Sequence, residues 1–230
     1  MKSPTVMPLR YSINKPQALM SYTIEKITSV LKSKAYPYLE DDKKPHNLNL
    51  VGIRTAGTAV NSFDDTMAVF WKYNGLWTLR IFPCTTDPGV TGLITPMNPK
   101  GTAIVKEGHY KDVWHIGMHQ GKYKALTQKN PITVIRDFDR DKELDFNSGK
   151  EETGLFGINC HRANENGKSI QVDGWSQGCQ VLQNKQINNP DNQAVKVFEF
   201  DYFMNLCQRK VDAGNGYSFS YSLVNSRDFQ

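Results

Sequence analysis

The chain has 230 residues, of which 39% are hydrophobic and 11% aromatic, and its 28 basic and 23 acidic residues give a formal net charge of +5. This length is enough to bury a core in one domain, or in one domain plus a small appendage. The basic residues form no run of five or more, so we expect an ordinary solvated surface and no nucleic-acid partner. The four cysteines include no CxxC pair, which argues against a zinc cluster and a disulfide-dense scaffold, and no cofactor is expected.

The first 45 residues predict a helical appendage followed by a linker. Apolar residues spaced by four, three and four positions share one helical face: Met20, Ile24, Ile27 and Leu31. The helix is expected to begin after Pro16 and to end before Pro37, because proline suits the first turn of a helix and interrupts later ones. The polar stretch YPYLEDDKKPHN is typical of a linker. Residues 46–230 then form the main domain.

The main domain is expected to be mainly β, in the α+β class, built as a sandwich or barrel. Its apolar runs are short, rich in β-branched and aromatic residues, and separated by Gly, Pro, Asn and Asp: LNLVGIRT, TMAVFWKY, LWTLRIFPC, GTAIVKEG, HYKDVWHIGMH, ITVIRDF, GLFGINCH, CQVL and FSYSLV. The sequence YNG before Leu76 predicts a hairpin turn. The segment AVKVFEFDYFMNLCQRK predicts the one further helix.

The stretch GINCHRANENGKSIQVDGWSQGCQV, residues 157–181, holds the residues best suited to chemistry. One strand-like run ends at His161 and another begins at Cys179, so adjacent strand ends would bring an imidazole and a thiol together. Gly178 allows a sharp turn that exposes Cys179. A lone cysteine is more often a buried structural thiol, but a loop of seventeen residues in a compact domain is more often functional than decorative.

This pattern resembles the active-site motif of the YkuD-type L,D-transpeptidase catalytic domain, in a phage- or effector-like form. The family's usual motif is HG, a loop, and then S-H-G-C-[VI]-R. The resemblance spans Leu48 to Val224 and is strong over residues 157–181, and upstream NPKGTAIVKEGHYKDVWHIG is similar to the family's turn and strand. It implies a YkuD-like β-sandwich or barrel and a cysteine acyl-enzyme formed on a peptidoglycan stem peptide, which then passes to an amine or to water.

Carried over position by position, the resemblance implies Cys179 as the nucleophile and His161 as its base. It implies that the N–H groups of Gly178 and Cys179 receive the oxyanion. We expect the pKa of the Cys179 thiol to be depressed, because the thiolate is the attacking species. The residues expected to contact substrate are Ser176, Arg162, Trp175 and Gln177.

Three positions depart from the family motif. Arg162 replaces the glycine after the histidine, Gln177 replaces a second histidine, and Val181 stands where an arginine is usual. Arg162 offers a replacement charge for a substrate carboxylate. Because no acceptor-binding feature is evident, hydrolysis by an L,D-carboxypeptidase or endopeptidase is favoured over transpeptidation. The alternatives are a non-catalytic wall-binding or virion structural protein that retains the fold, and a cysteine protease or amidase acting on proteins.

Two further groups of residues are weaker candidates. His109, His115 and His119 are expected to be structural, since His115 and His119 share a strand face but lie too far apart for one metal, although one histidine could line the cleft. Acidic residues alternate in RDFDRDKELDFNS in a way that suits Ca²⁺: Asp137, Asp139, Asp141, Glu143 and Asp145. Lys142 and Ser148 replace the glycine and the glutamate of a typical calcium loop, so a charged hairpin tip is the favoured alternative.

The loop from Thr85 to Gly101 is rich in glycine and proline and is a candidate cover for the cleft. The first seventeen residues lack the apolar run of a signal peptide, and no run in the sequence is long enough to span a membrane. We therefore expect synthesis in the cytoplasm without a standard signal. Delivery to the cell wall would then use lysis, a virion or an injection apparatus, whose components are expected partners besides peptidoglycan peptides.

Overall fold

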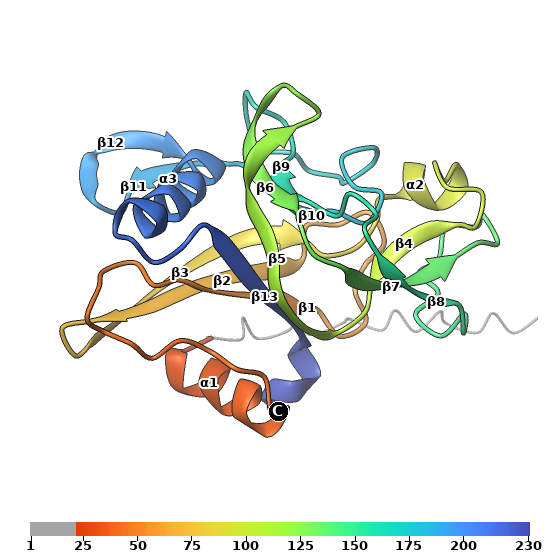
Figure 1. Cartoon of the computed structure of the whole chain (residues 1–230). Coiled ribbons are helices and arrows are strands. Elements are labelled where there is room, and N and C mark those ends of the chain that lie inside the picture. Colours follow the sequence, from red (N-terminus) through yellow and green to blue (C-terminus); the bar gives the residue numbers. More distant parts are fainter. Residues whose placement is uncertain (1–21) are drawn as a thin grey trace, which may run out of the picture.

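The computed structural model describes residues 22–230, so Pro16 and Met20 of the expected helix lie outside the described residues. The elements follow one another along the chain as shown in Figure 1: α1 (Ile24–Ser33), β1 (Asn49–Arg54), β2 (Asp65–Tyr73), β3 (Leu76–Thr85), α2 (Val90–Ile94), β4 (Thr102–Val105), β5 (Gly108–His119), β6 (Tyr123–Gln128), β7 (Ile132–Asp137), β8 (Glu151–Gly154), β9 (Cys160–Arg162), β10 (Gln180–Leu182), β11 (Gln186–Asn189), β12 (Asn192–Phe198), α3 (Glu199–Asp212), β13 (Ser218–Asn225) and the 3₁₀ helix η1 (Ser226–Phe229).

Eight strands close into a barrel in the order β1-β13-β5-β6-β9-β10-β3-β2. The pairs β1–β13 and β9–β10 are parallel, and the other six pairs are antiparallel. Closure leaves the barrel without an exposed edge strand. The prediction of a mainly β, α+β fold is confirmed, with 40% of the described residues in strands and 16% in helices.

Large aromatic and aliphatic side chains fill the barrel. Trp114 and Tyr221 are fully buried with ring centroids 4.5 Å apart, and the Trp114 indole N–H donates to the Ile158 carbonyl at 2.8 Å. A buried indole with its hydrogen bond satisfied contributes apolar area without an unpaired donor. From α3, Phe200, Phe203 and Leu206 join the same core. This core fixes the strands that carry the site.

Two smaller sheets flank the barrel on different sides. The β11–β12 hairpin and α3 lie together at one side of the barrel, and the β4-β7-β8 sheet lies with α2 at the opposite side (Figure 1). Thr102 and Ala103 of β4 and Arg136 of β7 border a cavity that is also lined by residues near β9 and β10. The second sheet therefore supplies one wall of this cavity.

Helix α1 packs against the outer face of the barrel. Thr23 caps it by accepting from the Lys26 N–H at 3.3 Å, and its buried residues pack on Val51 and Ile53 of β1. An ion pair of 3.0 Å between Lys34 and Asp228 joins the end of α1 to η1. The predicted N-terminal helix is confirmed, and it shares a core with the barrel.

Most strand predictions are confirmed, including the YNG hairpin between β2 and β3, where Asn74 and Gly75 have φ of 48° and 77°. The run GLFGINCH is mostly irregular, since β8 ends at Gly154 and β9 begins only at Cys160. No strand was predicted from the sequence at β6, β8, β11 or β12. Their residues are more polar than those of a buried strand, and β11 and β12 are mostly exposed.

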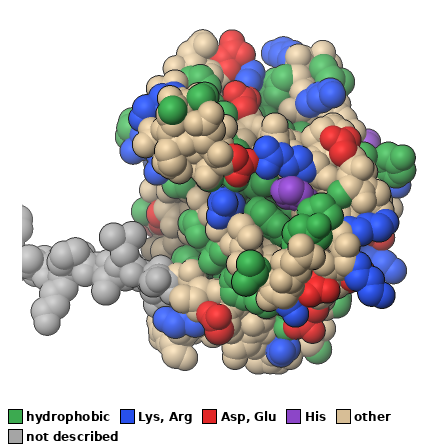
Figure 2. All heavy atoms as spheres, turned by 90° about the vertical axis from the view of Figure 1, so that its left-hand side faces the viewer, with side chains coloured by type: hydrophobic (Ala, Val, Ile, Leu, Met, Phe, Trp, Pro, Cys, Tyr) green, Lys and Arg blue, Asp and Glu red, His purple; other side chains and the backbone are tan. Residues whose placement is uncertain are grey.

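The surface of the described chain carries mixed charges. On the face shown in Figure 2, basic and acidic side chains are interspersed and neither sign forms a large patch. This pattern is typical of an ordinary solvated surface. Within residues 22–230, no helix is long and apolar enough to cross a membrane.

Candidate active site

Cys179 and His161 reach the same cavity from neighbouring strands. β9 and β10 pair in parallel with Val181 opposite His161, and Cys179 directly precedes β10. Because side chains alternate along a strand, Cys179 lies on the same face as Val181 and His161. Both side chains border a cavity of about 940 Å³. Cys179 and His161 therefore line the same cavity. Within the described residues no hydrogen bond joins Sγ to the imidazole, and the thiol instead donates to the Gly157 carbonyl at 3.5 Å.

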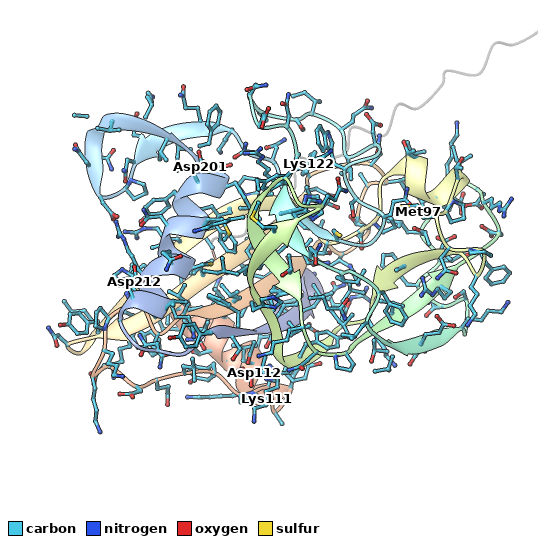
Figure 3. All side chains as sticks on the ribbon, turned by 45° about the horizontal axis from the view of Figure 1, so that its top comes forward. Met97, Lys111, Asp112, Lys122, Asp201 and Asp212 are labelled. Carbon is cyan, nitrogen blue, oxygen red and sulfur yellow. The ribbon has the colours of Figure 1, made fainter. Side chains whose placement is uncertain are left out.

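The cavity is of a size typical for a small-molecule or peptide site. Its rim includes Met97, which follows α2, and Lys122, in the turn between β5 and β6; Figure 3 shows these two residues on separate segments. Met97 belongs to the Thr85–Gly101 loop, so this loop does border the cleft as the sequence suggested. Gly101 to Ala103 and Arg136 form another part of the wall.

A tight turn presents Cys179. Gly178 has φ of +119°, and a Cβ at this position would lie 2.5 Å from the Ala103 carbonyl oxygen, so only glycine fits. The buried Ser176 hydroxyl donates to the Cys179 carbonyl at 2.9 Å and accepts from the Gly178 N–H at 3.2 Å. Of the two expected oxyanion donors, Gly178 is therefore engaged inside the turn. The Cys179 N–H has no hydrogen-bond partner within residues 22–230.

His161 is held in one tautomer. Its Nδ1 lies 2.7 Å from the Arg162 carbonyl oxygen, which can only accept, so Nδ1 carries the proton and Nε2 carries the lone pair. Burial, together with the neighbouring His119, lowers the pKa of His161 to about 3, although the bond to the Arg162 carbonyl opposes the shift. The imidazole is thus neutral and basic at Nε2 at physiological pH.

The Cys179 thiol is neutral in the resting site. Burial raises its pKa to about 11, although the Asn159 N–H directed at Sγ at 3.4 Å opposes this shift. The expected depression of this pKa is therefore wrong, because desolvation outweighs the one nearby donor. The other three cysteines, all within the described residues, are fully buried with pKa values raised more strongly, namely Cys84, Cys160 and Cys207. Cys179 remains the most accessible thiol.

His119 is a site residue that the sequence left as one of three structural histidines. Its ring stacks on that of His161, with centroids 4.1 Å apart and planes at 20°, and it also borders the cavity. Asn159 accepts the Gln128 N–H at its side-chain oxygen, so its amide nitrogen donates to His119 Nδ1 at 3.1 Å. His119 thereby fixes one face of the His161 ring. By contrast, His109 contacts Ser222 and His115 contacts Thr127.

The four expected substrate contacts have different positions. Arg162 borders the cavity, lies 4.1 Å from the Tyr123 ring centroid and pairs with Glu165 at 2.6 Å. Trp175 is 44% exposed at the cavity wall. Gln177 also borders the cavity, but its side-chain oxygen accepts the Met97 N–H at 3.0 Å. Ser176 is fully buried and serves the turn.

Val181, where the family motif has an arginine, is fully buried. It packs with three other apolar residues beside Cys179, namely Phe63, Ala163 and Val172. A guanidinium at this position would have to displace that cluster. The side chains around position 181 therefore suit the buried valine and not the arginine of the family motif.

A buried polar network under the turn was not foreseen from the sequence. Tyr221 donates to the Gln180 side-chain oxygen at 2.6 Å, and the Gln180 amide reaches the Thr86 and Gly178 carbonyls at 3.4 Å. Arg54, paired with Asp87 at 2.8 Å, donates to the same Thr86 carbonyl. These residues come from four separate strands and loops, so no local pattern marks them. The network anchors the residue that follows the thiol.

Comparison of the chain with protein-family models, with curated proteins and with solved structures finds no match.

Proposed function

We propose that the protein is a cysteine enzyme acting on peptidoglycan stem peptides, an L,D-carboxypeptidase or endopeptidase or an L,D-transpeptidase. The observation that carries the proposal is the fixed His161 tautomer. With Nδ1 bonded to the Arg162 carbonyl, the basic Nε2 is left for the thiol that shares the cavity. The motif resemblance over residues 157–181 supplies the class of substrate.

In the proposed reaction, His161 Nε2 takes the proton of Cys179 as the sulfur attacks the carbonyl of an L,D peptide bond. The Cys179 N–H donates to the oxyanion. The imidazolium then gives its proton to the leaving amine, and a thioester remains. Water or a second amine attacks the thioester, with His161 again as base, and releases Cys179.

The charge states of Cys179 and His161 in the empty site determine when the thiol proton is transferred. A thiol with a pKa near 11 beside an imidazole with a pKa near 3 does not form a stable ion pair in the empty site. Proton transfer is therefore coupled to attack on a bound carbonyl. Stacking on His119 keeps the His161 ring in place during this step.

Arg162 is the proposed partner for a substrate carboxylate. Its guanidinium borders the cavity, and its present partner Glu165 is exposed, so a substrate carboxylate would compete with that ion pair. Hydrolysis is favoured over transfer, because Gln177 and Val181 are both engaged in internal contacts and do not offer an acceptor site. We propose delivery to the wall in a virion, through an injection apparatus or by lysis.

The second candidate function is a wall-binding or virion structural protein that retains the fold without catalysis. The raised pKa of Cys179 favours it, because a neutral thiol is a weak nucleophile. The two functions share the cavity and differ in whether the thiol forms a covalent bond with substrate.

The test is incubation of the full chain with purified tetrapeptide muropeptides, with and without an excess of a D-amino acid, read by mass spectrometry. We expect shortened or opened stems, a thioester adduct of Cys179, and no products from Cys179→Ala. Cys207→Ala is the matched control, since that thiol lies on α3 and does not border the cavity. D-amino acid exchange as the main product would select the transpeptidase, and binding without any product would select the non-catalytic function.

A further inference from the structure

Three carboxylates converge where β7 runs into the loop before β8. Asp137, Asp139 and Asp145 each offer an oxygen, and these atoms all lie within 4.8 Å of one another. Calcium binds oxygen ligands at about 2.3–2.6 Å, so ligands on opposite sides of one ion are about 5 Å apart. A single ion could therefore contact all three side chains at once.

Two buried oxygen atoms on paired residues of β4 and β7 lack hydrogen-bond partners within the described residues. The Asp137 side chain is 1% exposed, and its Oδ1 has no hydrogen-bond partner within residues 22–230, while Oδ2 accepts the Asp145 N–H at 3.1 Å. Thr102 is 3% exposed, and within the same residues its Oγ1 also lacks a partner. Thr102 is the register partner of Asp137 across β4 and β7, so the two side chains point to the same face.

Buried oxygen atoms are rarely left unpaired, because they lose their hydrogen bonds to water. The hydroxyl of Thr102 is independent of the acidic cluster and comes from a different strand. Because Thr102 pairs with Asp137 in the register, its unpartnered hydroxyl is a second buried oxygen on the same face as the carboxylate.

The negative charge of the cluster is not compensated by neighbouring cations. None of the three carboxylates takes part in an ion pair within the described part of the chain. Arg136, next to Asp137, points its guanidinium to Glu152 at 2.9 Å and to the Gly101 carbonyl at 3.3 Å. Lys150 lies 3.9 Å from the Phe138 ring centroid.

We propose that Asp137, Asp139, Asp145 and Thr102 form a binding site for Ca²⁺. An all-oxygen set of carboxylates and a hydroxyl suits a hard cation, and irregular spacing on a loop suits calcium better than the stricter octahedron of Mg²⁺. The ion would join the β7–β8 loop to β4. Thr102 and Arg136 also border the catalytic cavity, so the ion would hold one wall of it in place. The site does not depend on the proposed function.

The ligand set is smaller than the alternating sequence suggested. Asp141 and Glu143 lie outside the group of three. The Asp141 side chain instead accepts the Glu143 N–H, and both residues are exposed. Alternation alone therefore overstated the number of ligands. The same two residues provide matched controls, because they carry similar charge in the same loop.

The test uses the full chain stripped with EDTA and then titrated with CaCl₂ alone. We expect a saturable heat of binding with one ion per chain and a melting temperature about 5–10 °C higher at a hundredfold excess over Kd. Mg²⁺ should give a smaller shift at equal concentration. Asp137→Asn and Asp145→Asn should lose both signals, and Asp141→Asn and Glu143→Gln should keep them.

Circular dichroism of each variant in EDTA establishes that it is folded before calcium is added. Thr102→Val, which preserves the shape of the side chain, should weaken binding several-fold without abolishing it. Absence of heat and of a thermal shift in the native chain at millimolar calcium would overturn the proposal. An equal response in Asp137→Asn and Asp145→Asn would overturn it as well, since the ion would then bind elsewhere.

Discussion

Two polar regions reach the same cavity, the turn through Cys179 and the carboxylate cluster through Thr102, and they differ in how well their buried atoms are paired. In the Cys179 turn, the Ser176 hydroxyl, the Gln180 amide and the Tyr221 hydroxyl all have partners within the protein. At the end of β7, Asp137 Oδ1 and Thr102 Oγ1 have no partner within residues 22–230. These three side chains of the turn are thus paired without a ligand, and the Asp137 and Thr102 oxygens are not.

This difference has a physical consequence. A satisfied network holds its geometry before substrate arrives, which keeps reacting groups in place. An unsatisfied acidic cluster gains free energy when a cation binds, so its loop is expected to respond to the medium. We therefore expect changes in the turn to alter catalysis and stability together, and changes in the cluster to act mainly through the cation.

The largest expected effect is on chemistry. His161→Gln should lower the turnover of muropeptides by about 10²–10⁴-fold, because the general base is lost while the Cys179 turn stays intact. Steady-state assays with mass-spectrometric product detection measure this. His109→Gln is the control, since that histidine bonds Ser222 outside the cavity. Unchanged turnover in His161→Gln would remove His161 from the mechanism.

Gly178→Ala tests the rigidity of the turn. The alanine Cβ would lie 2.5 Å from the Ala103 carbonyl oxygen and would also force φ of +119°, so we expect a loss of about 2–4 kcal/mol in unfolding free energy, together with loss of activity. Gly57→Ala separates the two causes. Gly57 has φ of +67° with nothing within 4 Å of a Cβ, so it should cost about 1–2 kcal/mol by strain alone. Equal costs in urea unfolding would show that the close contact does not matter.

The third prediction concerns the reactivity of Cys179. Because its pKa is about 11, its rate of alkylation by iodoacetamide should rise about 100-fold from pH 7 to pH 9. A free cysteine would level off near pH 8.5. Peptide mapping should show Cys179 modified ahead of Cys84, Cys160 and Cys207, which are fully buried. A plateau below pH 8 would mean that His161 and Cys179 form an ion pair in the resting site.

The sequence predicted the turn better than the cluster because the turn is local. Ser176, Gly178 and Cys179 lie within four consecutive positions, and the sharp turn before Cys179 follows from glycine conformation. Ser176 was expected to contact substrate and the Gly178 N–H to receive the oxyanion, whereas in the structure these two groups bond each other inside the turn. His161 was predicted from strand ends that pair directly. The position of His119 against His161 depends on the pairing of β5 with β6 and of β6 with β9, which no local pattern encodes.

The pairing of Asp137 with Thr102 and the pKa of Cys179 were also not predicted correctly, because both depend on the folded arrangement of the chain. The partner of Asp137 is Thr102, thirty-five positions earlier, and only the register of β4 and β7 places them side by side. The pKa of Cys179 was predicted in the wrong direction because the sequence shows which groups are near in the chain but does not show how much water the fold excludes. The mainly β class itself was predictable, since it follows from short apolar runs and their turns, and the choice between a sandwich and a barrel was left open.

The smallest expected effect isolates the charge of the cluster from the cation. In EDTA at pH 7, Asp137→Asn should be more stable than the native chain by on the order of 1 kcal/mol, a value reduced by the openness of the loop to solvent. The sign follows from linkage. The folded pKa of Asp137 is about 6, above its unfolded value near 4, so the native chain holds this proton more tightly. The stabilisation that comes from protonated Asp137 is therefore fully present below pH 4 and is lost as the pH rises to about 6. Asparagine cannot ionise, so the difference between the variant and the native chain should vanish near pH 4.

Urea unfolding in EDTA at pH 4 and pH 7 measures this, with Asp141→Asn as a control that should show little change at either pH. A variant that is less stable than the native chain at pH 7 in EDTA would show that the Asp137 carboxylate is already compensated without a cation.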